Sequence, residues 1–484
     1  MTHNCQTWLY NYADQGGPCL SHPPSGQSVF PSKSYEVTNV NFMSIEYAVK
    51  QQPVRRDLSL QVAIFLALGW ALYACLAGEV FQPLFNSVTA HQWPRHILLP
   101  SLWWAAMGLL LLGYRTILWL RYREFSQATE QNAPSLTVVI PAYNEGAMVE
   151  KTIDSVAAAD YPHDRLEIFV VDDGSRDDTW VYISRAAKRH PGLVTAIRFP
   201  ENRGKRAALA TGFRRARGEV LVTIDSDSII ECDTLRAIAG PFHDPRVGAA
   251  AGRVSVYNRR QGLIPRMLHV RFILSFDFLR ATESTYRTVY CCPGALAGYR
   301  ASVVREVLPQ WETQTFLGLA CTFGEDRALT NYILQAGYDS VYQRSAVVHT
   351  IVPTSYRKLS KMLLRWDRSY VREELRLARI LWKRPLVARI TTLVERTITN
   401  LRYPVSYATL GMLLVLVAED PLTLLRLAIS IGIISTLYTM YYLRSERSWD
   451  FVYGIAYAYF SFVALSWIFP YAVITARARS WLTR

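Results

Sequence analysis

Long apolar runs near both ends constrain most strongly how this chain folds. Each run approaches the length of about 20 residues that a helix needs to cross a bilayer, and together they cover residues 60–80, 97–120, 402–417, 422–441 and 451–474. A polar block separates the second run from the third. The sequence therefore predicts a water-soluble domain inserted between helical membrane segments.

Arginines around the first two runs indicate their direction. Arg55 and Arg56 precede the first run and Arg121 and Arg123 follow the second, whereas the loop between the runs holds little charge. Because cytoplasmic flanks carry the excess of Lys and Arg, both outer flanks are predicted to be cytoplasmic. The soluble block then lies on the cytoplasmic side of a bacterial-type plasma membrane.

The last run allows two alternatives. If residues 451–474 crossed the membrane, Arg477, Arg479 and Arg484 would lie outside, against the positive-inside rule. Pro470 also interrupts the run. We favour a re-entrant or interfacial segment over a third span here. The sequence therefore predicts six segments: a disordered cytoplasmic tail (1–58), two transmembrane helices (59–121), a catalytic domain (130–370), amphipathic interfacial helices (371–400), a transmembrane hairpin (401–442) and this last segment with its terminal loop (451–484).

The soluble block alternates between strand and helix patterns. SLTVVIP, LEIFVVDDGS, VTAIRF and EVLVTIDSDS are short buried-strand runs, and helical patterns such as EGAMVEKTIDSVAAA and KRAALATGFRRARG separate them. Such alternation predicts an α/β domain with a parallel, doubly wound sheet. Ligands of these sheets bind at the carboxyl ends of the strands.

Two of these strand ends are acidic. Asp172 and Asp173 close one run, and Asp225 and Asp227 close another in LVTIDSDS. Two carboxylates so close repel each other unless a cation lies between them. A strand end followed by a helix cap is the simpler alternative, but a second acidic cluster at the same edge disfavours it.

The charge balance narrows the class of partner. Lys and Arg exceed Asp and Glu by 53 to 39, a net charge of +14, which favours phosphorylated substrates or an acidic lipid surface. Nucleic acid is not expected, since no zinc-finger, RNP or basic-zipper pattern is present. The 13 Trp and 28 Tyr are typical of a protein at a membrane interface. No feature predicts an oligomeric state.

Three motifs in order, VVIPAYNEGAMV, VVDDGS and IDSD, resemble family 2 glycosyltransferases with the GT-A fold. Within that family, residues 135–375 resemble hyaluronan synthases and their chitin-synthase-like bacterial relatives, through NRGKRAALATGF, YRTVYCCPGALAGYR, FLGLACTFGEDRALTN and RWDRSYVRE. The resemblance implies a processive membrane enzyme that polymerises a β-linked polysaccharide from a UDP-sugar donor onto a growing polysaccharide acceptor. It also implies a divalent ion, Mn²⁺ or Mg²⁺, for which oxygen ligands are suitable.

The resemblance assigns the donor site position by position. Asp225 matches the aspartate on the nucleotide side and Asp227 the principal metal ligand. Lys205 and Arg206 match a basic pair near the diphosphate, at a helix start that suits anions; a solvated helix face is the alternative. The other positions matched to nucleotide-sugar binding are Ala142, Tyr143, Glu145, Asp173, Arg365 and, in the terminal SWLTR, Arg484.

The resemblance also assigns the reacting groups. Asp326 in GEDR falls on the general base that takes a proton from the acceptor hydroxyl, with a helix N-terminal carboxylate as the alternative; Glu325 replaces the family's usual Asp. Trp366 matches the floor of the acceptor site, although core packing also fits it. Gly294, Ala295 and Leu296 stand in the run that shapes this site.

Met362 stands where processive relatives carry Gln, so two enzyme functions remain open. One is a polymerising synthase that also translocates its product. The other is a transferase that adds one or a few sugars to a lipid or glycan. A catalytically silent partner of a polysaccharide assembly is disfavoured, because Asp225, Asp227, Asp326 and Arg365 are all intact.

Overall fold

The computed structural model describes residues 66, 69, 70, 73 and 92–478. The predicted disordered tail, most of the first apolar run and the terminal SWLTR motif with Arg484 lie outside the described residues. Residues 97–120, the second predicted span, fall within one helix, α5 (Gln92–Arg121).

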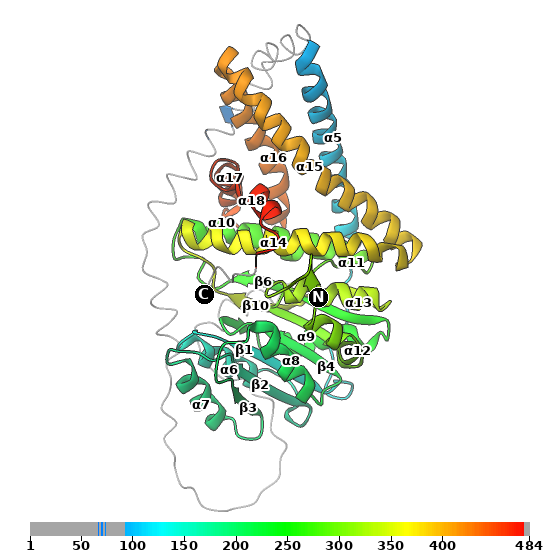
Figure 1. Ribbon diagram of the computed structural model, residues 1–484, viewed down its shortest axis with the longest axis vertical. Helices are drawn as coiled ribbons and strands as arrows, with labels where there is room; N and C mark the ends of the chain where they lie inside the picture. The colour runs from blue at the N-terminus through cyan, green and yellow to red at the C-terminus, as the bar shows by residue number, and fades with distance from the viewer. Residues whose placement is uncertain (1–65, 67–68, 71–72, 74–91, 479–484) are drawn as a thin grey trace, which may run out of the picture. The chain divides into compact units, whose positions relative to one another are not determined.

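An eight-stranded mixed sheet forms the centre of the soluble domain (Figure 1). Its strand order is β3-β2-β1-β4-β7-β6-β10-β5. The strands are β1 (Leu136–Ala142), β2 (Leu166–Asp172), β3 (Val194–Arg198), β4 (Val220–Ile224), β5 (Ser228–Ile230), β6 (Val247–Val256), β7 (Leu296–Arg300) and β10 (Asp339–Thr350); β8 (Thr315–Phe316) and β9 (Leu319–Ala320) form a separate hairpin.

Most of this sheet has the predicted parallel arrangement. Strands β3, β2, β1 and β4 pair in parallel, and so do β6 and β10. Strand β7 runs antiparallel to both β4 and β6, and β5 runs antiparallel to β10. The expectation of a parallel sheet is therefore wrong for β7 and β5. Strand β7 reads Leu-Ala-Gly-Tyr-Arg, and its small residues suit a crowded central position: a Cβ on Gly298 would lie 2.9 Å from Phe242.

Helices cover both faces of the sheet, so β1 is buried along its whole length. Val138 and Ile140 pack with one set of helices and Val139 with the other. The first set comprises α6 (Met148–Ala157), α7 (Thr179–Arg189) and α9 (Thr234–Ala239); the second comprises α8 (Lys205–Arg215), α12 (Ala301–Glu312) and α13 (Glu325–Gln335).

The remaining helices connect this domain to the apolar segments. Helix α14 (Tyr356–Ile380) contacts α13 on its domain side and α18 on the other (Figure 1). Helix α5 packs with α11 and α15, and α10 packs with α17. Their bounds are α10 (Leu263–Ile273), α11 (Leu279–Thr285), α15 (Leu386–Glu419), α16 (Leu422–Glu446), α17 (Phe451–Phe460) and α18 (Ile468–Ile474), with π-helical turns at Leu274–Phe278 (η3) and Ser461–Leu465 (η5).

The helix boundary expected near residue 400 falls elsewhere. Helix α14 ends at Ile380, a short turn follows, and α15 runs without a break from Leu386 through the predicted start of the hairpin. Arg384 is extended, as a residue before proline tends to be. Its buried guanidinium donates to Asp339 at 2.8 Å and to the Tyr338 carbonyl at 2.7 Å. These bonds fix the turn between α14 and α15 against the sheet.

Among the described residues, α15 and α16 are long and apolar enough to cross a membrane. Helices α17 and α18 would supply a third span if the bent pair counts as one, with a bend of 49°. Pro470 has no N–H for the carbonyl of Ser466, four residues earlier. The Tyr407 hydroxyl of α15 donates to that carbonyl instead, at 2.8 Å. The interruption expected at Pro470 is therefore present, and α15 stabilises it.

Candidate active site

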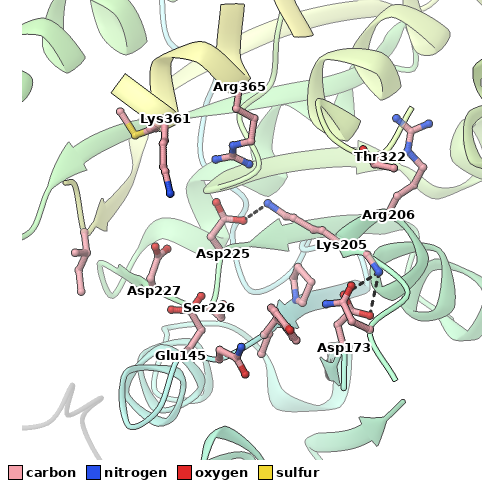
Figure 2. Close-up of a pocket in the computed structure, with 18 of the residues that line it drawn as sticks. Glu145, Asp173, Lys205, Arg206, Asp225, Ser226, Asp227, Thr322, Lys361 and Arg365 are labelled. Carbon is pink, nitrogen blue, oxygen red and sulfur yellow. Dashed lines mark hydrogen bonds and ion pairs between the residues drawn. The ribbon is translucent and has the colours of Figure 1, made fainter. Parts of the chain in front are cut away.

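Three neighbouring parallel strands end at one edge of the sheet and open into a cavity. Strands β2, β1 and β4 end at Asp172, Ala142 and Ile224. The residues that follow them line a cavity of about 1190 Å³, together with residues of the loop before α8 and of α14 (Figure 2). This is the edge where the sequence predicted the site.

The loop after β1 is held by the loop after β2. Asn144 and Gly146 have positive φ angles of 53° and 57°, so the chain turns sharply here. The N–H groups of Glu145 and Gly146 both donate to the Thr179 hydroxyl, at 2.8 and 2.9 Å. This turn keeps Tyr143 and Glu145 on the cavity wall, next to Ala142.

Asp173 contacts the loop that precedes α8. Its carboxylate accepts the N–H of Arg203 at 2.7 Å and that of Gly204 at 2.9 Å. Burial raises the pKa of Asp173 to about 6, although both backbone bonds act to lower it. The side chain therefore joins the ends of β2 and the α8 loop at the cavity wall.

Lys205 and Arg206 point in different directions. The Lys205 ammonium lies 2.5 Å from Asp225 and 3.3 Å from Glu325. Burial alone would lower the pKa of Lys205, but these two carboxylates raise it. The Arg206 guanidinium instead donates to the Trp311 carbonyl and to Gln314. Both residues of the predicted basic pair line the cavity, but of the two only Lys205 pairs with the acidic cluster.

Asp225 and Asp227 both reach the cavity, but their partners differ (Figure 2). Asp225 pairs with Lys205, whereas Asp227 accepts hydroxyl groups of Ser228 and Thr350, both at 3.3 Å. Burial and the charge of Asp225 raise the pKa of Asp227 to about 6. The predicted repulsion between these carboxylates is therefore present, and Asp227 is the one without a cationic partner among the described residues.

Glu325 and Asp326 begin α13 beside Lys205. Gly324 precedes them with φ +78°, and a Cβ there would lie 2.0 Å from the Ser369 hydroxyl of α14. Asp326 accepts the N–H of Gly294 at 3.3 Å. Burial and the charge of Glu325 raise the pKa of Asp326. Burial would also raise the pKa of Glu325, but Lys205 and the other nearby cations lower it.

One face of α14 forms the opposite wall of the cavity. Lys358, Lys361, Met362 and Arg365 line it, at the three- and four-residue spacing of one helix face. Figure 2 shows Lys361 and Arg365 extending from α14 toward the side where Asp225 and Asp227 lie. The sequence analysis missed both lysines, although their spacing from Arg365 could have revealed them.

The described residues contain no group of three or more His, Cys, Asp or Glu side chains that could hold a metal ion. The His349 ring, which could also bind a metal ion, lies 2.9 Å from Glu231. Any ion at Asp225 and Asp227 would therefore take its other ligands from substrate oxygens or water. Such a donor set suits Mg²⁺, which binds through one or two carboxylates plus phosphates.

Residues 137–308 match the sequence model of the glycosyl transferase family 2. This segment is therefore a family 2 glycosyltransferase domain. The computed fold agrees with this assignment: a mannosyltransferase from Pyrobaculum calidifontis, in complex with GDP-Man and Mn²⁺, superposes with a TM-score of 0.55. The superposition covers 74% of this chain and 96% of that chain at 24% identity, and it establishes the GT-A-like α/β fold that the sequence predicted.

Two curated relatives match about half of the chain. An N-acetylglucosaminyltransferase of Rhizobium sp. (strain N33) is 36% identical over 249 residues, 51% of this chain and 55% of the relative. A hyaluronan synthase of Streptococcus pyogenes is 36% identical over 258 residues, 52% of this chain and 61% of the relative. The match therefore spans little more than half the length of these relatives.

Three residues predicted for the acceptor lie away from the cavity wall. Ala295 and Leu296 of the glycosyltransferase domain are buried in its core. Trp366 packs against the rings of Phe272 and Phe276, with centroids 6.1 and 6.4 Å away. These two ring contacts agree with the alternative for Trp366, which is packing in the core.

Proposed function

We propose that this chain is a membrane-bound, inverting glycosyltransferase that polymerises a β-linked polysaccharide from a UDP-sugar. Its product would resemble chitin or hyaluronan and would leave through the membrane helices. The names of the two relatives support this class of product. The helices that are apolar enough to span a membrane support a membrane enzyme, and the flanking arginines favour a cytoplasmic catalytic domain.

The charge distribution across the cavity carries the proposal. Asp225 and Asp227 lie on one wall, and the cationic face of α14 lies on the other (Figure 2). A diphosphate with a bound divalent ion would be complementary to both walls at once: Asp225 and Asp227 would hold the ion, and Lys361 and Arg365 would bind the phosphate oxygens. A cavity of about 1190 Å³ has room for a nucleotide and its sugar.

In this proposal Asp326 is the general base. Its position beside Gly294 and its raised pKa suit a carboxylate that takes the proton of an acceptor hydroxyl. The hydroxyl oxygen forms a bond to the anomeric carbon as the bond to the diphosphate breaks. One displacement inverts that carbon, so an α-linked donor gives a β-linked product.

Asp227 would hold the metal ion, with Asp225 beside it. Mn²⁺ or Mg²⁺ bound there neutralises charge on the departing diphosphate. Lys205, which already pairs with Asp225, would hold that carboxylate and the nearby Glu325 in place. Arg365 would bind the diphosphate from α14, and Ala142, Tyr143 and Asp173 would contact the base of the nucleotide.

Met362 favours a second candidate, a transferase that adds one or a few sugars. The side chain is 8% exposed and lies on the cavity wall. An apolar thioether there cannot supply the hydrogen bonds of the amide that the resemblance leads one to expect. A weaker hold on the acceptor would release shorter products.

A donor screen tests both candidates. The purified full chain in nanodiscs receives Mn²⁺ or Mg²⁺ with UDP-GlcNAc, UDP-GlcA, UDP-Glc or UDP-Gal, singly and in pairs. UDP release and product size are measured together, with Asp326→Asn as the control. Release with long products supports the synthase, and release with short additions supports the second candidate. No release with any donor would contradict both and favour a silent partner protein.

A further inference from the structure

Three charged side chains meet on the membrane-facing side of α14. Asp367 follows Trp366 on this helix, Arg327 follows Asp326 on α13, and Arg271 lies on α10. Each is half-buried. Among the described residues, none of the three side chains makes an ion pair within 4.0 Å or a side-chain hydrogen bond. Half-buried charges normally find such partners, because an unpaired one is costly.

Other polar groups on the same face of α14 are paired with residues of α15. One and two turns after Asp367, Tyr370 and Glu374 face α15. Glu374 binds Arg396 at 2.6 Å and Asn400 at 3.0 Å, and the Tyr370 hydroxyl donates to Asn400. Asp367 continues this row toward the N-terminal end of α14, where no described side chain of α15 bonds it.

The two arginines of this cluster lie over aromatic rings. Arg271 lies over the rings of Trp366 and Tyr457, 6.0 and 5.6 Å from their centroids. Arg327 lies over Tyr370 at 5.3 Å. Burial raises the pKa of Asp367 to about 6, although Arg271 and Arg327 act to lower it. The carboxylate is thus desolvated, has cations nearby and lacks a direct hydrogen-bond donor.

We propose that Asp367, Arg271 and Arg327 bind a sugar unit of the acceptor chain on the membrane side of Asp326. The proposal rests on the glycosyltransferase function proposed above. Sugar hydroxyls can donate to Asp367 and accept from the two guanidinium groups, which satisfies all three charges. The flat faces of a β-linked sugar pack against rings such as Trp366 and Tyr370.

The site suits a neutral acceptor unit, such as a hexose or an N-acetylated hexosamine, whose hydroxyl and amide groups supply the donors that Asp367 lacks. The position of this site next to the proposed base makes it an acceptor subsite that is separate from the donor cavity.

Calorimetric binding to the full chain in nanodiscs, saturated with UDP, tests this site. The probe is a tetrasaccharide of β-1,4-linked N-acetylglucosamine, which wild-type protein should bind. Asp367→Asn should weaken that binding by about tenfold, because a hydrogen bond to a charged group is lost, and should leave the affinity for UDP unchanged.

Glu374→Gln is the matched control, since it removes a carboxylate from the same helix face that is already paired. It should lower thermal stability without weakening tetrasaccharide binding. Should Asp367→Asn unfold, Arg271→Met provides the second variant with the same expected loss. Unchanged binding in a folded variant, or no binding of the tetrasaccharide to wild-type protein, would overturn this inference. UDP release from a donor is scored separately, so failure of the proposed function is distinguishable.

Discussion

Lys205→Met removes the one ammonium that Asp225 and Glu325 share, while it keeps a side chain of similar length. Loss of one partner from a buried ion pair costs about 3–5 kcal/mol. Lys205 and Asp225 retain 20% and 28% of their side-chain exposure, and only Glu325, at 6%, is well buried. Because solvent screens the exposed part, we expect a loss of about 2–3 kcal/mol in the free energy of unfolding.

The loss in the free energy of unfolding depends on pH, and Glu325 determines whether it grows or shrinks as the pH rises. In the wild type, Lys205 and neighbouring cations hold the pKa of Glu325 below its ordinary value. Ionised Glu325 therefore stabilises the fold above a pH of about 4.3, and this contribution is lost as the pH falls through the lower folded-state pKa. Without Lys205, burial raises that pKa, so the variant loses stability as the pH rises. The two proteins should differ most at pH 8 and least at pH 5.

Thermal unfolding in nanodiscs at one fixed scan rate measures the difference. At pH 8 the apparent Tm of Lys205→Met should be about 4–10 °C below that of the wild type. Adding Glu325→Gln should restore part of the loss, since the buried charge is then gone. Mn²⁺ should raise the Tm of the variant more than that of the wild type, because the ion then neutralises Asp225. Equal apparent Tm values at pH 8 would refute the reasoning.

Three further variants test the site. Asp326→Asn should keep its UDP affinity, measured by calorimetry, but its transfer rate should fall by about 100-fold or more. Near-normal turnover of this variant would require another base. In the wild type, the raised pKa of Asp326 should make UDP release decline on the acid side at a pH above about 4. Gly324→Ala should cost about 2–4 kcal/mol through its left-handed φ and the contact with Ser369, and Ser369→Gly should relieve part of that loss in thermal unfolding. Met362→Gln should lengthen products on size-exclusion chromatography, and an unchanged length distribution would contradict the role given to Met362.

The strand ends could be predicted because their signal is local. Strands buried on both faces are short continuous apolar runs, so β1, β2 and β4 and the acids that follow them are visible in the sequence. Strand β7 gives no such signal. Its alanine and glycine have low strand propensity, and the crowding of Gly298 by Phe242 comes from a distant part of the chain. The antiparallel position of β7 between β4 and β6 depends on such non-local packing.

Helix geometry separates the side chains of the predicted basic pair, although both residues line the cavity. Lys205 and Arg206 were assigned together because they are adjacent, but adjacent residues on a helix point about 100° apart. Lys205 therefore reaches Asp225 while Arg206 turns to Trp311. The same geometry, applied to residues 358–365, would have found Lys358 and Lys361 on the face of Arg365. Asp225 and Asp227, which line the same cavity, follow a strand end far away in the sequence, so only the structure brings them opposite these lysines.

Helix α14 explains how the donor cavity and the proposed acceptor site can act together. Arg365 and Asp367 are two residues apart, so their side chains diverge by about 200° around one rigid helix. One faces the donor cavity, and the other faces the membrane helices. The helix is fixed on its domain side, where Arg372 bonds the Phe323 carbonyl at 2.7 Å and Ser369 packs against Gly324, two residues before Asp326. A tilt of α14 would therefore move the diphosphate contact, the acceptor contact and the base in a single step.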